Sequence, residues 1–208
     1  MSRGPGPGRS PSRIVTSLAT LKPVASLLAI GLAQFGLIYP ADSGEMPGRT
    51  VSVAMDLGDI LSEEQIITDL QAGTRWEAID ELINNLVSTG KIKSEHHDAI
   101  SAVVKKRESS MSTGIGFGIG IPHASTDLIY EVVGALGRSK KGVNFDSLDN
   151  QPVNLVMLFL VPQGQFQKHL HTLANIAKLL HRAEFRQALE KAPDAKAMLD
   201  TIRDQGKK

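Results

Sequence analysis

His123 is the residue whose type and place in this sequence most favour chemistry. It follows Pro122 directly, after a run in which glycines alternate with apolar residues. A neutral imidazole is a nucleophile, and its unperturbed pKa of about 6.5 leaves a neutral fraction available in the cytosol. His123 therefore suits reversible phosphoryl transfer. Its position alone favours the opposite interpretation, because a single histidine near a strand end is more often structural or exposed to solvent.

His169 and His171 have the spacing of a metal pair on a strand. This segment has the apolar spacing of a helix, on which about 100° per residue puts the two side chains roughly 200° apart, so they cannot bind one ion together. The apolar stripe of the helix comprises Leu170, Leu173, Ile176, Ala177 and Leu180. His171 falls opposite this stripe, toward solvent. His169 falls at its edge, where a partly buried structural histidine is an equal alternative to a functional one.

The composition excludes several kinds of chemistry. The 208 residues include no cysteine, which excludes disulfides, thiolate metal sites and cysteine nucleophiles. The 23 basic and 22 acidic side chains leave a net charge of +1, too small for the global basic field that attracts nucleic acid. Carboxylates such as Glu108 are scattered on expected helix surfaces or ends, and no paired-carboxylate or Ser-His-Asp site stands out.

The alternating glycines of residues 114–120 do not form a nucleotide-binding loop. Their spacing departs from G-x-G-x-x-G because isoleucine occupies the third position, and no Gly-Lys-Ser/Thr follows as in a P-loop. Two interpretations stay open. The glycines either let another element pack closely, or expose backbone beside His123 to a partner or a phosphoryl group.

The elements that must position these residues begin with two capping signals. Ser62 with Gln65 forms a capping-box signature and predicts a helix through about residue 70. Thr74 with Glu77 repeats the signature, and apolar residues at helical spacing follow it until Gly90 ends the helix.

Ser94 can cap a third helix, which we expect to end near Arg107 with Ile100, Val103 and Val104 facing inward. From residue 114 the apolar period changes to two, which predicts a strand or hairpin that is apolar on one face and bare on the other. Further strands are expected at 131–136 and 153–161, the second covered on both faces. Helices are expected at 168–180, 184–191 and 194–204. This order predicts an α/β sandwich with helices on both faces of the sheet.

The stretch from Arg107 to His123 carries a longer pattern: Arg-Glu, then Ser-Thr-Gly-x-Gly-x-Gly, then Pro-His. It resembles enzyme IIA of the bacterial sugar phosphotransferase system, of the fructose/mannitol type. Residues 55–61, Met-Asp-Leu-Gly-Asp-Ile-Leu, resemble the start of the nitrogen-regulatory branch of that family. The resemblance extends to about residue 205, so we expect one domain over residues 53–205. It implies an α/β fold with a mixed β-sheet flanked by helices on both faces.

The resemblance also implies roles for single residues. His123 matches the phosphorylated histidine of the family, and His169, in His-Leu-x-x-Leu-Ala-x-Ile-Ala, matches its second active-site histidine. Arg107 matches an arginine near the phosphoryl site, and Thr113 can add a further donor. Gly120 stands where many relatives have alanine. A phosphohistidine carrier protein would be the donor, and no metal ion, nucleotide or other cofactor is required.

Two functions from different classes follow from this resemblance. The first is a cytoplasmic phosphocarrier that passes the group to a IIB component of sugar transport or a regulatory target, or signals by its phosphorylation state. We favour regulation over transport. The family's IIB domains of this type use a phosphorylated cysteine, so we expect no fused IIB domain, and without an array of membrane spans we expect no fused permease. The alternative is a non-catalytic protein-binding module of the same fold.

Residues 1–50 match nothing in the family. Basic residues precede an apolar run at 24–39 that lies between Pro23 and Pro40, as in a secretory signal or an anchor. The run is short for a membrane span, which needs about 20 residues. We favour a disordered or weakly helical extension, because an exported IIA domain would have no source of phosphoryl groups.

Overall fold

A computed structural model describes residue 1 and residues 57–206 of the chain. The expectations for the extension over residues 1–50 lie outside the described residues. So does the side chain of His171.

The described part is built on one six-stranded mixed sheet. The strands are β1 (Ile66–Ile67), β2 (Gly114–Gly116), β3 (Ile119–Gly120), β4 (His123–Thr126), β5 (Val133–Val143) and β6 (Val153–Pro162). They run in the order β1-β5-β6-β3-β2, and β4 also pairs with β6. β5 and β6 are antiparallel, whereas β3 and β4 both pair with β6 in parallel, one after the other. This arrangement confirms the predicted mixed α/β fold.

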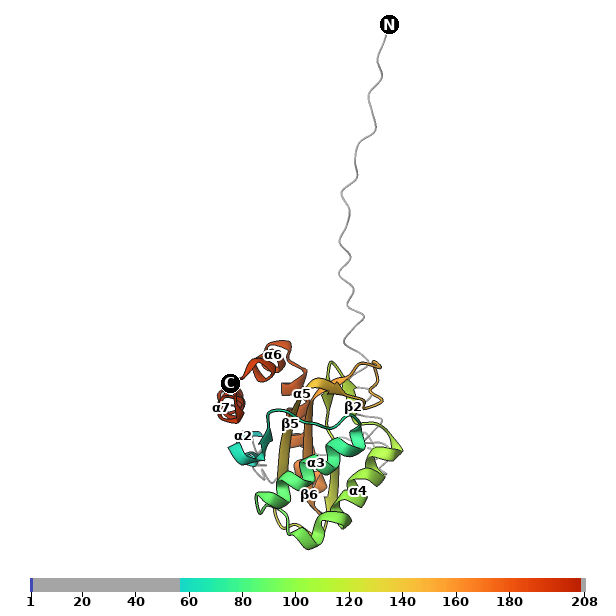
Figure 1. Ribbon diagram of the computed structural model, residues 1–208, viewed down its shortest axis with the longest axis vertical. Coiled ribbons are helices and arrows are strands. Elements are labelled where there is room, and N and C mark those ends of the chain that lie inside the picture. Colours follow the sequence, from blue (N-terminus) through green and yellow to red (C-terminus); the bar gives the residue numbers. More distant parts are fainter. Residues whose placement is uncertain (2–56, 207–208) are drawn as a thin grey trace, which may run out of the picture. The chain divides into compact units, whose positions relative to one another are not determined.

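Helices cover both faces of the sheet. They are α2 (Leu57–Ile60), η2 (Glu63–Gln65), α3 (Arg75–Ser88), η3 (Ser94–His96), α4 (His97–Ser110), α5 (Phe166–His181), α6 (Ala183–Lys191) and α7 (Ala195–Gly206). In Figure 1, α3 and α4 lie side by side in front of the sheet, and they pack against each other, β5 and β4. Leu158 and Leu160 of β6 belong to the core cluster that includes α3. Met157 and Phe159 alternate with them, point to the other face and are equally buried.

Of the two capping-box signals in the first half of the chain, the one at Thr74 is confirmed, whereas the helix predicted from the one at Ser62 is wrong. At the start of α3, the Glu77 backbone N–H donates to Thr74 Oγ1 (3.4 Å), and the Thr74 backbone N–H donates to Glu77 Oε2 (3.0 Å). The Ser62 backbone N–H likewise donates to Gln65 Oε1 (3.0 Å), but only a single 3-10 turn follows. The predicted helix through residue 70 is wrong because Gln65 Nε2 donates to the Gly134 carbonyl (2.6 Å), and the chain then pairs with β5 as β1.

Two further expectations need correction. Val103 does not face inward and is 38% exposed, because the buried stripe of α4 follows Ile100, Val104 and Glu108. The strand or hairpin predicted from residue 114 forms as the hairpin of β2 and β3, but Phe117 does not share an apolar face and is 55% exposed. It lies in the hairpin turn with φ of 57°, followed by a glycine with φ of 76°. Two-residue hairpin turns require such left-handed conformations, which most side chains disfavour.

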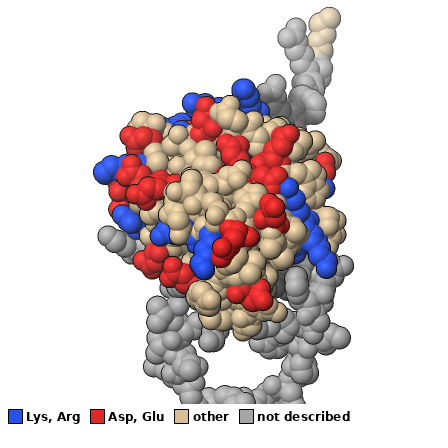
Figure 2. Space-filling view, turned by 60° about the horizontal axis from the view of Figure 1, so that its bottom comes forward, with Lys and Arg blue, Asp and Glu red and all other residues tan. Residues whose placement is uncertain are grey.

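The strands and helices predicted in the second half all form, but the strand predicted at 131–136 is β5, which begins at Val133 and continues to Val143. β6 is buried at nine of its ten positions, as expected for a strand covered on both faces. The helices predicted at 168–180, 184–191 and 194–204 form as α5, α6 and α7. Within the described residues, no helix combines the length and the apolar character needed to cross a bilayer. On the face seen in Figure 2, basic and acidic side chains are interspersed, in keeping with the nearly balanced composition.

Candidate functional site

His123 begins a strand and does not end one. β3 and β4 pair with successive parts of β6, and His123 is the first residue of β4, opposite Phe159. The Pro122 carbonyl accepts a hydrogen bond from the Phe159 backbone N–H (3.0 Å), which holds the connection between the two strands against β6. The His123 side chain is partly exposed.

The backbone selects the tautomer of His123. Its Nδ1 lies 2.8 Å from the carbonyl oxygen of Ile121. A carbonyl can only accept, so Nδ1 carries the hydrogen, and the lone pair of the neutral ring lies on Nε2. The ring is therefore oriented with its nucleophilic nitrogen away from the backbone.

The surroundings keep this ring neutral. Burial lowers the pKa of His123 from 6.5 to about 4, with a smaller contribution from the positive charge of Arg107 in the same direction. The hydrogen bond to Ile121 acts the other way. A neutral imidazole is the nucleophilic form, so the site holds His123 in that form across the physiological pH range.

The first turn of α5 approaches the same ring. The rings of Phe166 and His123 are stacked, with centroids 6.3 Å apart and planes inclined by 23°. His169 lies three residues further along α5, on the same side of the helix, and is partly exposed. The fold thus brings the segment containing His169 to His123, from 46 residues away in the sequence.

Arg107 lies in the last turn of α4 and is only partly satisfied. Its Nη1 donates to the Met111 carbonyl (3.0 Å), whereas its Nε is buried and has no acceptor among the described residues. Burial lowers the pKa of Arg107, and the neighbouring Glu108 partly offsets this effect. A guanidinium has five N–H donors and prefers oxyanions, so Arg107 can bind an anion that arrives beside His123.

Glu108 is the residue that the sequence interpretation misplaced. It is 1% exposed, not on the helix surface. The backbone N–H of Thr113 donates to Glu108 Oε1 (2.9 Å), and the Thr113 hydroxyl donates to Oε2 (2.6 Å). The available signal was its spacing, four residues after Val104 and eight after Ile100 on the buried side of α4.

Two opposing effects set the pKa of Glu108. Burial raises it, and this is the larger effect. The two hydrogen bonds from Thr113 and the charges of Arg75 and Arg107 lower it. The carboxyl group therefore depends on these partners to stay ionised in the interior.

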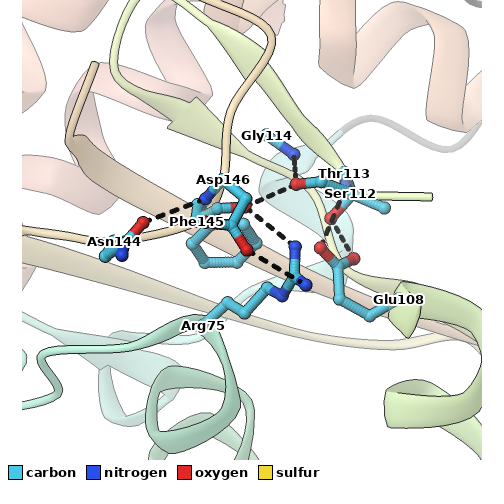
Figure 3. Close-up of polar contacts among 8 residues, drawn as sticks. All are labelled: Arg75, Glu108, Ser112, Thr113, Gly114, Asn144, Phe145 and Asp146. Carbon is cyan, nitrogen blue, oxygen red and sulfur yellow. Dashed lines mark hydrogen bonds and ion pairs between the residues drawn. The ribbon is translucent and has the colours of Figure 1, made fainter. Parts of the chain in front are cut away.

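A second set of polar contacts links the segment after α4 to the loop after β5. Arg75 Nη1 (3.2 Å) and Ser112 Oγ (2.6 Å) both donate to the Phe145 carbonyl, and Arg75 also pairs with Asp146 at 3.2 Å. Ser112 Oγ in turn accepts from the Gly114 backbone N–H (3.1 Å). Figure 3 shows these contacts beside the Glu108–Thr113 pair. The segment 111–114 is thus held by α4 and by the loop after β5, and Arg75 of α3 in turn binds that loop.

The expected site residues are placed as follows. Arg107, Thr113 and His123 gather around the segment between α4 and β4, and His169 lies one helical turn from the ring that stacks on His123. The Thr113 hydroxyl is engaged by Glu108, so its role as a donor to a phosphoryl group stays a prediction. In the described ranges, no three histidine, aspartate or glutamate side chains form a cluster that could hold a metal ion.

Comparison with known proteins gives a consistent result. Residues 59–205 match the family described as "Phosphoenolpyruvate-dependent sugar phosphotransferase system, EIIA 2". The chain is 35% identical over 153 residues to the PTS system fructose-specific EIIABC component of Bacillus subtilis (strain 168), covering 74% of this chain but only 24% of that protein. It is 30% identical over 148 residues to the nitrogen regulatory protein of Bradyrhizobium diazoefficiens, covering 71% of this chain and 95% of that protein.

A solved structure agrees with these sequence relationships. The crystal structure of the nitrogen regulatory protein IIA-Ntr from Neisseria meningitidis superposes with a TM-score of 0.64 at 27% identity. The match covers 70% of this chain and 97% of that one. The similarity therefore includes nearly the whole of a nitrogen regulatory protein, but only about a quarter of the Bacillus EIIABC component.

Proposed function

The chain belongs to the EIIA type-2 family of the phosphoenolpyruvate-dependent sugar phosphotransferase system, and on this premise we propose that His123 accepts the phosphoryl group. The protein is a phosphocarrier component of that system. One observation carries the choice of residue. The bond between His123 Nδ1 and the Ile121 carbonyl (2.8 Å), in a site that lowers the pKa of the ring to about 4, leaves a neutral imidazole with its lone pair on Nε2.

In the proposed reaction, a phosphohistidine on a carrier protein approaches in line with Nε2 of His123. The phosphorus–nitrogen bond in the donor breaks as a new one forms to Nε2, and the donor ring leaves with the electron pair. The hydrogen on Nδ1 of His123 stays bonded to the Ile121 carbonyl. Such transfers depend on positioning and on stabilising the charge of the three equatorial oxygens, and no metal ion or nucleotide enters this scheme.

The neighbouring residues supply that stabilisation. Arg107 is a nearby cation with a buried Nε free to donate among the described residues, and we assign it to the oxygens of the phosphoryl group. His169 is assigned a second donor role, since α5 brings it to the side of the site where Phe166 covers the His123 ring. Together these groups would stabilise the negative charge of the phosphoryl group as it transfers.

For the step after phosphorylation, we propose that the protein either signals by its phosphorylation state or transfers the phosphoryl group to a regulatory target protein. The alignment with the Bradyrhizobium nitrogen regulatory protein over 95% of its length supports this choice, as does the similarity to IIA-Ntr. Transfer to a IIB component in sugar transport is the second candidate. It is favoured by the 35% identity to the fructose-specific Bacillus protein. Either role requires a phosphohistidine donor, and we therefore propose that the working protein is cytoplasmic.

The test is phosphorylation of the full chain by phosphoenolpyruvate and the donor proteins of the system. We expect one acid-labile phosphoryl group, mapped by mass spectrometry to His123, and none in His123→Ala. His96→Ala, which changes the last residue of η3, is the matched control and should label normally. Full labelling of His123→Ala would exclude the proposed acceptor, and a wild-type chain that never labels would favour the non-catalytic binding module.

We also propose that residues 53–205 form the whole phosphocarrier domain and that residues 1–50 are dispensable for it. A chain that starts at Met55 should keep the thermal stability and the phosphorylation rate of the full chain. A fall in either quantity, or recovery of the native protein in a membrane fraction, would show that the extension has a structural or anchoring role.

A further inference from the structure

We propose that Glu108 is a positioning residue for the phosphoryl-accepting site, because it sets the orientation of His123 and the place of Arg107 through the segment between α4 and β2. This inference rests on the function proposed above, since it assigns one more residue to the same reaction. Glu108 touches neither the phosphoryl group nor the His123 ring in this scheme. It acts through Thr113.

The first step is the contact between Glu108 and Thr113. Both carboxylate oxygens accept from the same residue, one from its backbone N–H (2.9 Å) and one from its hydroxyl (2.6 Å). The two side chains are 1% and 5% exposed, so water does not compete for these bonds. Bonds to a carboxylate are about twice as strong as neutral ones. Thr113 is therefore held in both its backbone and its side-chain conformation.

The second step runs from Thr113 to His123. Across the β2–β3 hairpin, the Thr113 carbonyl accepts from the Ile121 backbone N–H (3.1 Å). The Ile121 carbonyl then accepts from His123 Nδ1 (2.8 Å). A continuous series of hydrogen bonds thus joins Glu108 to the imidazole. A displacement of Thr113 moves the carbonyl that selects the His123 tautomer.

The third step runs from Glu108 to Arg107. These are consecutive residues in the last turn of α4, and they hold the following segment at two points. Arg107 donates to the Met111 carbonyl (3.0 Å), and Glu108 binds Thr113 two residues later. Releasing Thr113 would loosen the Met111 carbonyl, which is the acceptor that holds the Arg107 guanidinium beside His123.

The chemistry of position 108 argues against a role in packing alone. Ile100 and Val104 occupy the preceding positions of the same buried stripe, where an apolar side chain would fill the space without burying a charge. Well-packed apolar residues often stabilise such positions better than buried ions do. The charged groups that act on Glu108 are Arg75 from α3 and Arg107 from α4. What the carboxylate adds is directed hydrogen bonds to the segment that leads to the site.

Four variants of the full chain test whether Glu108 acts through its hydrogen bonds to Thr113 or through its negative charge. In Glu108→Gln the amide oxygen can accept from the Thr113 N–H while the amide nitrogen donates to the Thr113 hydroxyl, so both contacts persist without the charge. Glu108→Ala removes both contacts, and Thr113→Val removes only the hydroxyl contact at nearly constant shape. Thr113→Ser keeps the hydroxyl and is the conservative variant that tests rescue of the contact.

We expect the rate of phosphorylation at saturating donor to fall about 10²-fold in Glu108→Ala, because a displacement of about 1 Å can cost that much. Thr113→Val should lose about tenfold, as expected for one hydrogen bond. Glu108→Gln and Thr113→Ser keep both contacts, so these conservative variants should rescue most of the rate that Glu108→Ala and Thr113→Val lose. The half-saturating concentration of donor should not change in any of them, since Glu108 is buried and does not contact the donor.

A second readout needs no donor. ¹⁵N chemical shifts of His123 report its tautomer, and we expect Nδ1–H in the wild type, Glu108→Gln and Thr113→Ser, but a mixture of tautomers in Thr113→Val and Glu108→Ala. A purely structural role would lower the melting temperature and leave the tautomer unchanged.

Wild-type rates and an unchanged tautomer in Thr113→Val and in folded Glu108→Ala would overturn the inference. If Glu108→Ala does not fold, Thr113→Val alone decides between these outcomes. A wild-type chain that is not phosphorylated at His123 would overturn the proposed function instead, and the tautomer measurement would still test Glu108.

Discussion

The guanidinium groups of Arg138 and Arg107 both reach into the protein interior, but their hydrogen bonds differ. Arg138, in β5, is 6% exposed, and within the described part of the chain its guanidinium donates to four backbone carbonyls. Those carbonyls belong to Thr68 (3.0 Å), Leu189 (3.0 Å), Glu190 (3.0 Å) and Ala192 (2.6 Å). Three of them lie at the end of α6, where helical carbonyls lack partners within the helix and a cation is favourable. Arg138 therefore fastens α6 to the sheet.

Arg107 donates to a single carbonyl in the described structure, and its buried Nε has no acceptor there. An unpaired buried donor costs stability. An oxyanion that enters beside His123 would satisfy it. Arg138, whose guanidinium has no buried unpaired nitrogen among the described residues, has a structural role, whereas Arg107, with a buried unpaired Nε next to a neutral histidine, is suited to bind an incoming anion.

The largest effect should follow the loss of Arg138. In Arg138→Met, the carbonyls at the end of α6 lose their donor, and we expect the free energy of unfolding to fall by about 3–5 kcal/mol, as when one partner of a buried charged interaction is removed. Urea denaturation at constant temperature measures it. The folded fraction should still be phosphorylated at the wild-type rate. A loss of rate in folded Arg138→Met would remove the distinction between the two arginines.

Arg107→Met should show the reverse pattern. Loss of a donor to the transferring group costs about 3 kcal/mol of transition-state stabilisation, so the transfer rate should fall about 10²-fold. Stability should change by less than about 1 kcal/mol, because a single hydrogen bond is lost. Transfer at the wild-type rate in this variant would show that Arg107 does not act on the phosphoryl group.

His169→Ala tests whether α5 supplies a second donor. The variant should fold, and its transfer should slow by up to about 10²-fold if His169 donates in the transition state. His181→Ala is the matched control at the other end of α5, where the ring packs edge-on against Phe117 at 4.7 Å. Equal rates in both variants and in the wild type would show that His169 is a packing histidine.

The smallest effect concerns pH. The pKa of His123 is lowered to about 4, so between about pH 6.5 and pH 4 the unfolded chain binds more protons at this residue than the native one. The contribution of His123 to the free energy of unfolding is therefore fully present above about pH 6.5 and is lost as the pH falls from 6.5 to about 4. In Arg107→Met the pKa should rise part of the way toward 6.5, since burial remains the larger cause, whereas Arg138→Met should leave it unchanged. NMR titration of the His123 ring measures both shifts, and equal values in the two variants would contradict the comparison.

The correct predictions depend on patterns within a few residues of sequence, whereas the error after Ser62 arises from a contact between distant parts of the chain. The start of α3, the continuous apolar run of β6 and the glycine hairpin were predicted because each depends on residues a few positions apart. The helix predicted after Ser62 failed because Gln65 reaches Gly134, 69 residues away. No local signal carries that contact.

The sequence by itself determined the family pattern from Arg107 to His123, the helical and strand periods around it, and the absence of cysteine chemistry. These depend on residue type and spacing alone. Only the tertiary structure decided that Glu108 is buried, that the Thr113 hydroxyl is engaged by it, and that the Ile121 carbonyl selects the His123 tautomer. The physical reason is that desolvation and hydrogen-bond geometry depend on which segments close over a side chain, and α3, α5 and the loop after β5 reach this site from distant parts of the chain.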